Sequence, residues 1–298
     1  MIAGIGKLYR GANEVTKVYL GTNVVYNSAV PIDSDARAYL DAISPFYSAT
    51  WLSDIGKTLA QFETDTSDMF IALKDNLLYA RLKAFYPMSG GTADSIKFNA
   101  KDPRNLDAAF RLTAFGSPAV TFNGIQGNGT TQYYSTHLNP TIAIPSATSY
   151  SHSVYSNSVV ISRNQSEIGS ITRNNSVFIA TKWSDNNTYI DNGNSGSNRV
   201  IVNNAGQTGL ILGSRVANND SRGFVRGLQT GATQTIIGGT LTNHDLYLIS
   251  YNNSGNPTAF SNRALQFAHV GDGMTAAEVA IFNSIVHTAQ LNQNRGAY

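Results

Sequence analysis

The spacing of hydrophobic positions changes twice along the chain, and each change predicts a different secondary structure. Residues 1–30 alternate apolar and polar side chains, as half-buried β-strands do. Residues 31–87 repeat apolar side chains every three or four positions, which is the spacing of one helix face. Short strand-like runs follow and continue to about residue 270. The chain therefore predicts strands, then helices, then a long β region.

The first thirty residues contain an internal repeat. Lys7–Val15 reads KLYRGANEV and Lys17–Val25 reads KVYLGTNVV, so Lys, Tyr, Gly, Asn and Val recur in register. Each copy predicts a strand, a turn at Gly-x-Asn and a second strand. Two hairpins bury too little surface to be stable alone. Either they pack against the rest of the chain, sister chains or a larger assembly, or they are an ordinary N-terminal hairpin pair.

The helical spacing predicts a first helix that Asp33 or Ser34 caps and that Pro45 ends. Its apolar face consists of Ala36, Tyr39, Leu40 and Ile43. A second stripe breaks at Glu63–Thr66, and a third continues as far as Phe85–Pro87. Met88–Thr92 is rich in glycine and predicts a hinge. The aromatic residues on these stripes are expected to lie in the core, because the helical spacing already explains them.

After the hinge, runs such as Ser176–Trp183 and Ala264–Val270 predict strands, and clusters of Asn, Ser and Gly between them favour tight turns. Strands at this spacing without intervening helices indicate an antiparallel sandwich. Thr275–Glu278 is a capping box that predicts a closing helix, expected to cover a sheet edge or face. The apolar face of this helix consists of Val279, Phe282, Val286 and Ala289.

Composition narrows the function classes. Charged residues make up 13% of the 298 residues, the net charge is +2, and the basic residues are scattered, so a nucleic-acid partner is not expected. The absence of Cys excludes thiol nucleophiles and zinc–thiolate sites. No apolar run has the length of a membrane helix, so no membrane insertion is expected. Met1–Lys7 lacks the features of a secretory signal, so synthesis in the cytoplasm without Sec-dependent export is expected.

Several segments carry a resemblance to known families. Residues 95–290 resemble the concanavalin A-like, laminin-G-like jelly roll through Val120–Gly124, Gly127–Tyr134, Phe267–Met274 and the closing helix. The N-terminal repeat and further short motifs are similar to structural proteins of tailed-bacteriophage virions, including fibre and tail-associated proteins. These motifs are Ala80–Pro87, Gly90–Ala93, Lys97–Asn99 and Lys101–Pro103.

The resemblance implies a mainly β protein in three parts. Residues 1–30 would be a β-repeat that attaches to the virion, residues 31–90 a helical region, and residues 91–298 a concanavalin A-like jelly roll with its closing helix. It also implies other virion proteins as partners, location in the virion, and a symmetric homo-oligomer, with a trimer favoured as in fibres. The residues predicted for virion attachment are Tyr9, Gly11, Asn13, Tyr19, Gly21 and Asn23.

Catalysis is not expected. Glycoside hydrolysis needs two carboxyl groups on one face, but the acids of the β region lack the Glu-x-Asp-x-x-Glu spacing of laminarinase-like enzymes. There is no Gly-x-Ser-x-Gly elbow, and His152 and His269 are expected to be hydrogen-bonded sheet residues. No cofactor is expected, although the resemblance implies that a rim Ca²⁺ is possible. Its candidate ligands are Asp185, Asp191 and Asp220, for which solvated turn positions are the alternative.

A sugar-binding patch is predicted at one hairpin. Trp183 and Tyr189 supply aromatic faces, and Asn186 and Asn187 supply amides for vicinal hydroxyls. The alternative is that Trp183, which ends an apolar run, is a core residue, and the alternation favours this alternative. We therefore expect a phage virion protein that attaches through its N-terminus and displays a glycan-binding sandwich to the host surface. The alternatives are a head-fibre, decoration or tail-assembly protein that binds other virion proteins, and a polysaccharide-degrading enzyme.

Overall fold

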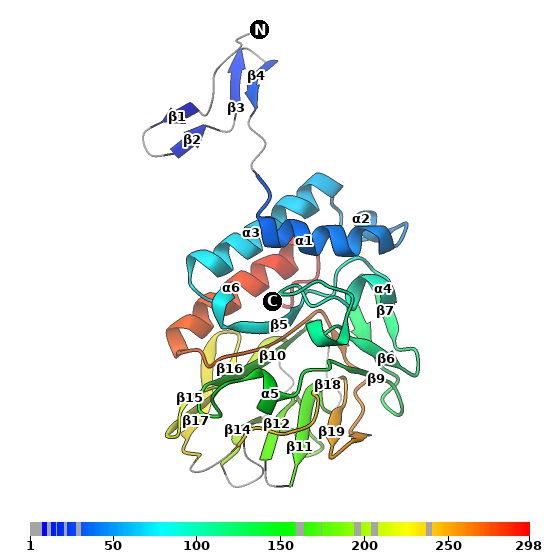
Figure 1. The fold of residues 1–298 in the computed structure, drawn as a ribbon, viewed down its shortest axis with the longest axis vertical. Coiled ribbons are helices and arrows are strands. Elements are labelled where there is room, and N and C mark those ends of the chain that lie inside the picture. The colour runs from blue at the N-terminus through cyan, green and yellow to red at the C-terminus, as the bar shows by residue number, and fades with distance from the viewer. Residues whose placement is uncertain are drawn as a thin grey trace.

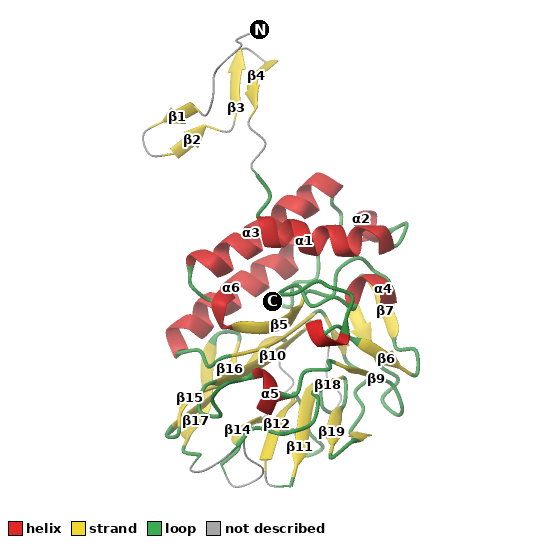
Figure 2. Ribbon diagram, viewed as in Figure 1, coloured by secondary structure: helices red, strands yellow, loops and turns green. Residues whose placement is uncertain are grey.

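The computed structural model describes residues 31–158, 164–173, 175–193, 198–203, 208–236 and 240–298, and the backbone of four strands within residues 8–27. The molecule is mainly β, with a layer of helices, a six-stranded sheet and a nine-stranded sheet stacked on one another (Figures 1 and 2). Nearly all strand pairs are antiparallel. The predicted jelly-roll-like sandwich with flanking helices is therefore confirmed.

The repeat forms the two predicted hairpins. β1 (Leu8–Arg10) pairs antiparallel with β2 (Asn13–Val15), and β3 (Lys17–Leu20) pairs antiparallel with β4 (Asn23–Asn27). The second pair has a register shift after Val18, so the two hairpins differ in detail. The described strands contain four of the six predicted attachment residues, whereas Gly11 and Gly21 lie outside the described residues.

The first helix begins and ends where the sequence predicts. α1 spans Ser34–Ile43, and the Oδ1 atom of Asp33 accepts hydrogen bonds from the backbone N–H groups of Asp35 (3.0 Å) and Ala36 (3.2 Å). A short helix, α2 (Trp51–Asp54), follows. The four residues of the predicted apolar face of α1 are buried.

The predicted break at Glu63–Thr66 is wrong, because α3 (Leu59–Asp75) runs through it. Thr58 and Gln61 form a capping box that starts the helix at Leu59. Within the helix, the Thr66 hydroxyl donates to the carbonyl oxygen of Phe62 at 2.8 Å, so this polar residue is accommodated without interrupting the helix.

The predicted continuation of helical structure to Pro87 is also wrong. Leu82–Tyr86 form β5, an edge strand of the six-stranded sheet that pairs with β22 (Phe267–Gly271). Leu77 adopts a left-handed φ of 58° just after α3, which ends the helix. In a strand, alternate side chains of β5 are buried on opposite faces of the sheet. The stability gained from this burial is larger than the local preference for a helix that the spacing indicates.

Each of the two main sheets combines strands from distant parts of the chain. In spatial order, the six-stranded sheet consists of β17 (Leu228–Gln234), β16 (Asp220–Val225), β15 (Gly209–Ala217), β10 (Tyr150–Ser156), β22 and β5. The main path of the nine-stranded sheet is β14 (Val200–Val202), β13 (Thr188–Asn192), β12 (Asn175–Ala180), β11 (Ile168–Thr172), β18 (Tyr247–Leu248), β9 (Tyr133–Ser135) and β6 (Thr113–Phe115).

Smaller elements complete the sandwich. β19 (Tyr251–Asn253) pairs parallel with β11 and antiparallel with β20 (Asn256–Thr258). A separate three-stranded sheet consists of β21 (Ala264–Leu265), β8 (Gly124–Gln126) and β7 (Ala119–Thr121). The other short α-helices are α4 (Ala93–Ile96) and α5 (Pro140–Ala143), and single 3-10 turns lie at Ser44–Phe46, Tyr79–Arg81 and Asp107–Ala109. Among the described residues, no helix has both the length and the apolar character needed to cross a bilayer.

The central strands β15, β10 and β22 of the six-stranded sheet are buried on both faces, whereas its edge strand β17 is largely exposed. Side chains alternate along each strand, so Leu210 and Leu212 pack against the helices while Ile211 packs against the nine-stranded sheet. Likewise Phe85 faces the helices, and its neighbours Ala84 and Tyr86 face the other sheet. The helices and the sandwich are therefore joined by one sheet that belongs to two cores.

The closing helix is confirmed in detail. α6 spans Ala276–Asn292, begins with the Thr275–Glu278 capping box, and lies beside α3 on the six-stranded sheet (Figure 1). Just after it, the fully buried Arg295 donates hydrogen bonds to the carbonyl oxygens of Pro87 (3.0 Å) and Met88 (2.9 Å). The predicted hinge at Met88–Thr92 therefore begins as a buried segment tied to the C-terminal residues.

Two histidines on opposite faces of the six-stranded sheet predict sensitivity to acid. Burial lowers the pKa of His152 and of His269 to about 3, from an ordinary value of 6.5. Between these values the unfolded chain binds more protons than the folded chain. The free energy of unfolding therefore falls as the pH drops below 6.5, by up to about 1.4 kcal/mol per pH unit for each histidine.

We expect His152→Phe to reduce this pH dependence, because it removes one titrating ring. Urea denaturation at neutral pH and at pH 5 measures the loss of stability, which should be about 2 kcal/mol smaller in the variant than in the natural protein. Tyr150→Phe, a neighbouring core change that keeps His152, is the control and should retain the full dependence. Equal pH dependence in His152→Phe and the natural protein would contradict the assignment.

Candidate functional site

The outer face of the nine-stranded sheet points away from the helices (Figure 1). This face carries aromatic side chains. In β12, Val177 and Ile179 lie in the core between the sheets, so Phe178 points to the outer face. In β13, Ile190 lies in the same core, so Tyr189 and Asp191 point outward beside Phe178. Strand alternation therefore sets the positions of these side chains.

Four rings form what we call the first aromatic cluster: Phe178, Trp183, Tyr189 and Tyr251. The Trp183 ring lies edge-on to Phe178 (centroids 5.9 Å apart) and to Tyr189 (6.3 Å). Tyr251 meets Phe178 edge-on at 5.5 Å. Phe178 is 2% exposed, whereas the other three rings are partly exposed. The cluster thus has a buried centre and an accessible rim.

Trp183 does not lie in the core, so the favoured core interpretation was wrong. The alternation of Val177, Ile179 and Thr181 extrapolates to an inward Trp183, but β12 ends at Ala180. Beyond the strand, a turn brings Trp183 to the outer face, and the backbone N–H of Trp183 donates to the carbonyl oxygen of Asn187 at 2.8 Å. Alternation predicts side-chain direction only while the backbone remains extended.

The four residues predicted for sugar binding lie together in this turn and the strand that follows. Asn186 is exposed and has a left-handed φ of 68°, which Asn tolerates. The Asn187 side chain donates to Asp185 at 3.1 Å, and the Tyr189 hydroxyl also donates to Asp185. This hydrogen bond lowers the pKa of Asp185. Asp185 therefore organises the turn.

An ion pair on the same face packs against the rings of the cluster. Arg199 donates two hydrogen bonds to the fully buried carboxylate of Asp191, at 2.7 and 2.6 Å, and the Ser176 hydroxyl donates a third at 2.7 Å. The Arg199 guanidinium lies 4.7 Å from the ring centre of Tyr189 and 5.4 Å from that of Phe178. Burial raises the pKa of Asp191, and Arg199 opposes this shift. The pair adds no net charge.

Sequence reasoning missed Phe178, Tyr251 and Arg199. Phe178 has a signal, because it alternates with the inward Val177 and Ile179. Tyr251 and Arg199 have none, because each comes from a separate strand or turn. Another missed residue is the fully buried Glu167, which accepts hydrogen bonds from the Thr181 N–H (2.7 Å) and the Ser261 hydroxyl (3.1 Å). Burial raises the pKa of this carboxyl group.

The predicted Ca²⁺ ligands do not converge. Asp185 binds residues of its own turn, Asp191 pairs with Arg199, and Asp220 pairs with Arg222, which donates at 2.9 Å. Across the described ranges, no three His, Asp or Glu side chains gather as a metal site would require. The predicted hydrogen bonding of His269 is confirmed, since its Nε2 atom lies 3.1 Å from the Ser151 hydroxyl.

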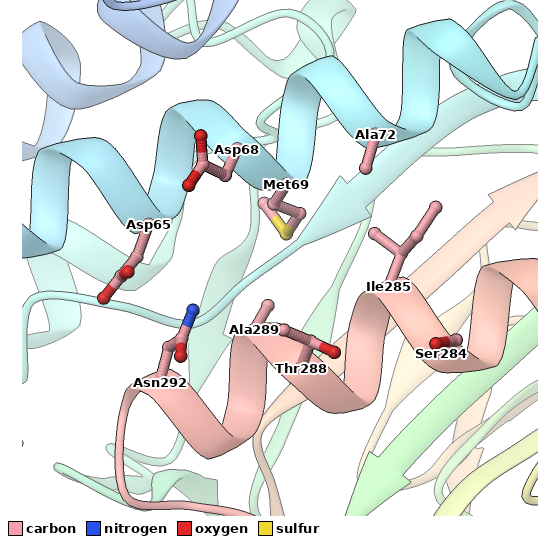
Figure 3. Close-up of a pocket in the computed structure, with 9 residues that line it drawn as sticks. All are labelled: Asp65, Asp68, Met69, Ala72, Ser284, Ile285, Thr288, Ala289 and Asn292. Carbon is pink, nitrogen blue, oxygen red and sulfur yellow. The ribbon is translucent and has the colours of Figure 1, made fainter. Parts of the chain in front are cut away.

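A groove of about 220 Å³ lies between α3 and α6, and two carboxyl-bearing residues are part of its lining (Figure 3). Asp65 and Asp68 project from α3, and the Lys57 ammonium lies 2.8 Å from Asp65. Partial burial and the Asp65 charge raise the pKa of Asp68. The rest of the lining is Met69, Ala72, Ser284, Ile285, Thr288, Ala289 and Asn292. Substitution of Asp65 or Asp68 can therefore test the alternative that the protein is a polysaccharide-degrading enzyme.

Comparisons with known proteins concern the fold. No protein-family model matches the chain, and no curated protein matches it. Domain 4 of an extracellular arabinanase from Geobacillus stearothermophilus, solved with arabinotriose, aligns with 68% of this chain and 98% of that chain, at 15% identity and a TM-score of 0.38. The binding domain of botulinum neurotoxin serotype D aligns with 69% of this chain and 52% of that chain, at 8% identity and a TM-score of 0.43.

A Trypanosoma rangeli sialidase variant with trans-sialidase activity aligns with 74% of this chain and 39% of that chain, at 11% identity and a TM-score of 0.41. The sequence identities and TM-scores of these matches are low. The fold is therefore described from the strand order of the sheets in this structure. Nothing about the ligand of this chain follows from them.

The ion pair between Asp191 and Arg199 gives a prediction about stability. Asp191→Asn keeps the shape of the side chain but leaves the charge of Arg199 uncompensated. We expect the free energy of unfolding to fall by about 3 kcal/mol, measured by urea denaturation. Asp220→Asn, which breaks a partly exposed pair with Arg222, is the matched control and should cost about 1 kcal/mol or less. Equal losses would contradict a special role for the Asp191 pair.

Proposed function

We propose that the protein is a non-catalytic virion component of a tailed bacteriophage that binds a host surface glycan through the outer face of its nine-stranded sheet. The observation that carries this proposal is the first aromatic cluster. Its partly exposed rings, Trp183, Tyr189 and Tyr251, lie beside the amides of Asn186 and Asn187. A sugar-binding site requires aromatic rings beside hydrogen-bonding amides, because a pyranose has an apolar side and a rim of hydroxyl groups.

The electrostatics of the site disfavour an anionic ligand. The Asp191 carboxylate is neutralised by Arg199, whereas the exposed Asp185 carboxylate accepts hydrogen bonds from Tyr189 and Asn187 and keeps its negative charge. A neutral polyhydroxylated chain therefore fits this surface better than an anionic ligand would.

The order of the layers supports attachment through the N-terminal residues. The described chain enters the helix layer at α1, and the aromatic face lies on the far side of the sandwich (Figure 1). A protein attached near residue 31 would therefore direct this face away from its support. With the resemblance of the Lys-x-Tyr-x-Gly-x-Asn repeat, this supports a virion protein that is made in the host cytoplasm, binds other virion proteins and forms a homo-oligomer.

Two alternatives differ from this proposal in the surface they use. A head-fibre, decoration or tail-assembly protein would use the same hairpins but bind only other virion proteins. A polysaccharide-degrading enzyme would use the Asp65 and Asp68 carboxyl groups in the groove between α3 and α6.

We expect Trp183→Ala to weaken glycan binding about tenfold, or ~1.4 kcal/mol, because it removes an accessible ring without emptying the core. Binding of the full chain to an array of bacterial surface polysaccharides measures this effect. Phe122→Ala removes an exposed aromatic ring outside the nine-stranded sheet and is the matched control. Circular dichroism establishes that both variants are folded.

Two outcomes would overturn this assignment. Absence of binding to every polysaccharide would favour the architectural alternative. Release of reducing sugar that disappears in Asp68→Asn would establish the hydrolase alternative instead.

The attachment proposal has its own test. We expect a chain that lacks residues 1–30 to be absent from purified particles, as measured by mass spectrometry and electron microscopy, because the hairpins are the proposed contact with the virion. The full chain carrying Phe122→Ala should be incorporated normally. Normal incorporation of the shortened chain would contradict attachment through the hairpins.

A further inference from the structure

A second group of aromatic side chains lies on the same sheet, and we call it the second aromatic cluster: Phe115, Tyr133, Tyr247 and Phe260. The rings of Phe115 and Tyr133 are parallel, with centroids 4.6 Å apart and an interplanar angle of 2°. Tyr247 lies 4.6 Å from Tyr133, and Phe260 lies 6.3 Å from it. The Phe115 side chain is 41% exposed, and the other three are partly exposed.

Strand register places this cluster on the outer face. Tyr134 and Leu248 are neighbours of Tyr133 and Tyr247 along their strands, and both are buried in the core between the sheets. Their alternation therefore directs Tyr133 and Tyr247 outward. Phe115 is paired directly with Tyr133 across β6 and β9, so it lies on the same face.

The two clusters are continuous across the sheet. Tyr247 pairs with Gly169, and Gly169 pairs with Phe178. A Cβ atom at position 169 would lie 3.1 Å from the Tyr251 side chain. Glycine at this position therefore leaves room for Tyr251, which contacts Phe178. From β6 to β13 there are five strand spacings, a span of roughly 24 Å. This is several times the width of one sugar ring.

We infer that this face binds a neutral glycan chain of several units, laid across the strands from Phe115 to Tyr189, and not a single terminal sugar. The inference rests on the proposed function and adds the ligand's length and path. A polysaccharide offers alternating apolar and hydroxyl-bearing surfaces along its whole length. The face offers a matching series, in which tyrosines combine an apolar ring with a hydroxyl group.

The charge of the face argues against an anionic partner, because the exposed Asp185 carboxylate keeps its negative charge. Asp191 lies in the same row of cross-strand partners as Tyr247, Gly169 and Phe178. Its carboxylate is neutralised by Arg199. Tyrosine and tryptophan rings also occur at the centres of protein interfaces, so a second copy of this chain is the alternative occupant. A measurement of oligomeric state distinguishes it from a neutral polysaccharide.

The test compares chain lengths. The probe is a ladder of neutral oligosaccharides, from monosaccharide to octasaccharide, made by partial acid hydrolysis of bacterial surface polysaccharides. Isothermal titration calorimetry measures the affinity of the full chain for each fraction. We expect affinity to increase with length until the chain reaches both clusters. Phe115→Ala should weaken binding of the longest fraction about tenfold and leave the shortest binding fraction unchanged.

Two variants serve as controls. Phe115→Tyr retains a ring at the same position and should retain affinity for long chains. Trp183→Ala should weaken binding of short and long fractions alike, because it alters the first cluster. Circular dichroism and light scattering show whether each variant keeps its fold and its oligomeric state.

The failures are distinguishable. If short and long fractions bind equally well, or if Phe115→Ala has no effect on long ones, the extended path is wrong and glycan binding at the first cluster stands. If no fraction binds, the proposed function fails and this inference fails with it. If Phe115→Ala changes the oligomeric state, the second cluster is a contact between copies of the chain, and the inference is overturned.

Discussion

The structure depends on the burial of one sheet from both sides. Every residue of β10 is buried, because alternate side chains enter the helix-side core and the core between the sheets. A sheet in this position needs a cover on each face, and α1, α3 and α6 supply one cover while the nine-stranded sheet supplies the other. The helical residues near the N-terminus and the helix near the C-terminus are therefore parts of the same packing arrangement as the sandwich.

Because of this constraint, the two faces of the nine-stranded sheet have different surroundings. The nine-stranded sheet has its inner face in the core, and its outer face is free to carry rings that are only partly covered. Asp191 and Arg199 pair beside those rings, and Glu167 accepts a hydrogen bond from the backbone of Thr181, so ring positions do not depend on the rings alone. A preorganised surface of this kind loses little side-chain entropy when a flexible ligand binds.

Sequence patterns succeeded where a local signal agrees with the tertiary environment. The caps of α1 and α6, the hairpin repeat and the sandwich class were all predicted, because each has a local cause in spacing, capping or turn residues. They failed at β5, where the burial of both faces outweighed a helical spacing. The turn that carries Trp183, Asn186 and Asn187 was recognised in the sequence, but Phe178, Arg199 and Tyr251 were not, because they come from different segments.

By itself, the sequence determined the types of most elements, the caps of α1 and α6, the absence of thiol chemistry and the turn that joins Trp183 to Tyr189. Tertiary structure decided which face Trp183 lies on, which rings join it, and that Phe115 and Tyr247 extend the same surface. The physical reason is that periodicity records how one strand divides its side chains between two faces. Which strands lie side by side, and which of their faces stays exposed, depends on packing between residues far apart in the chain.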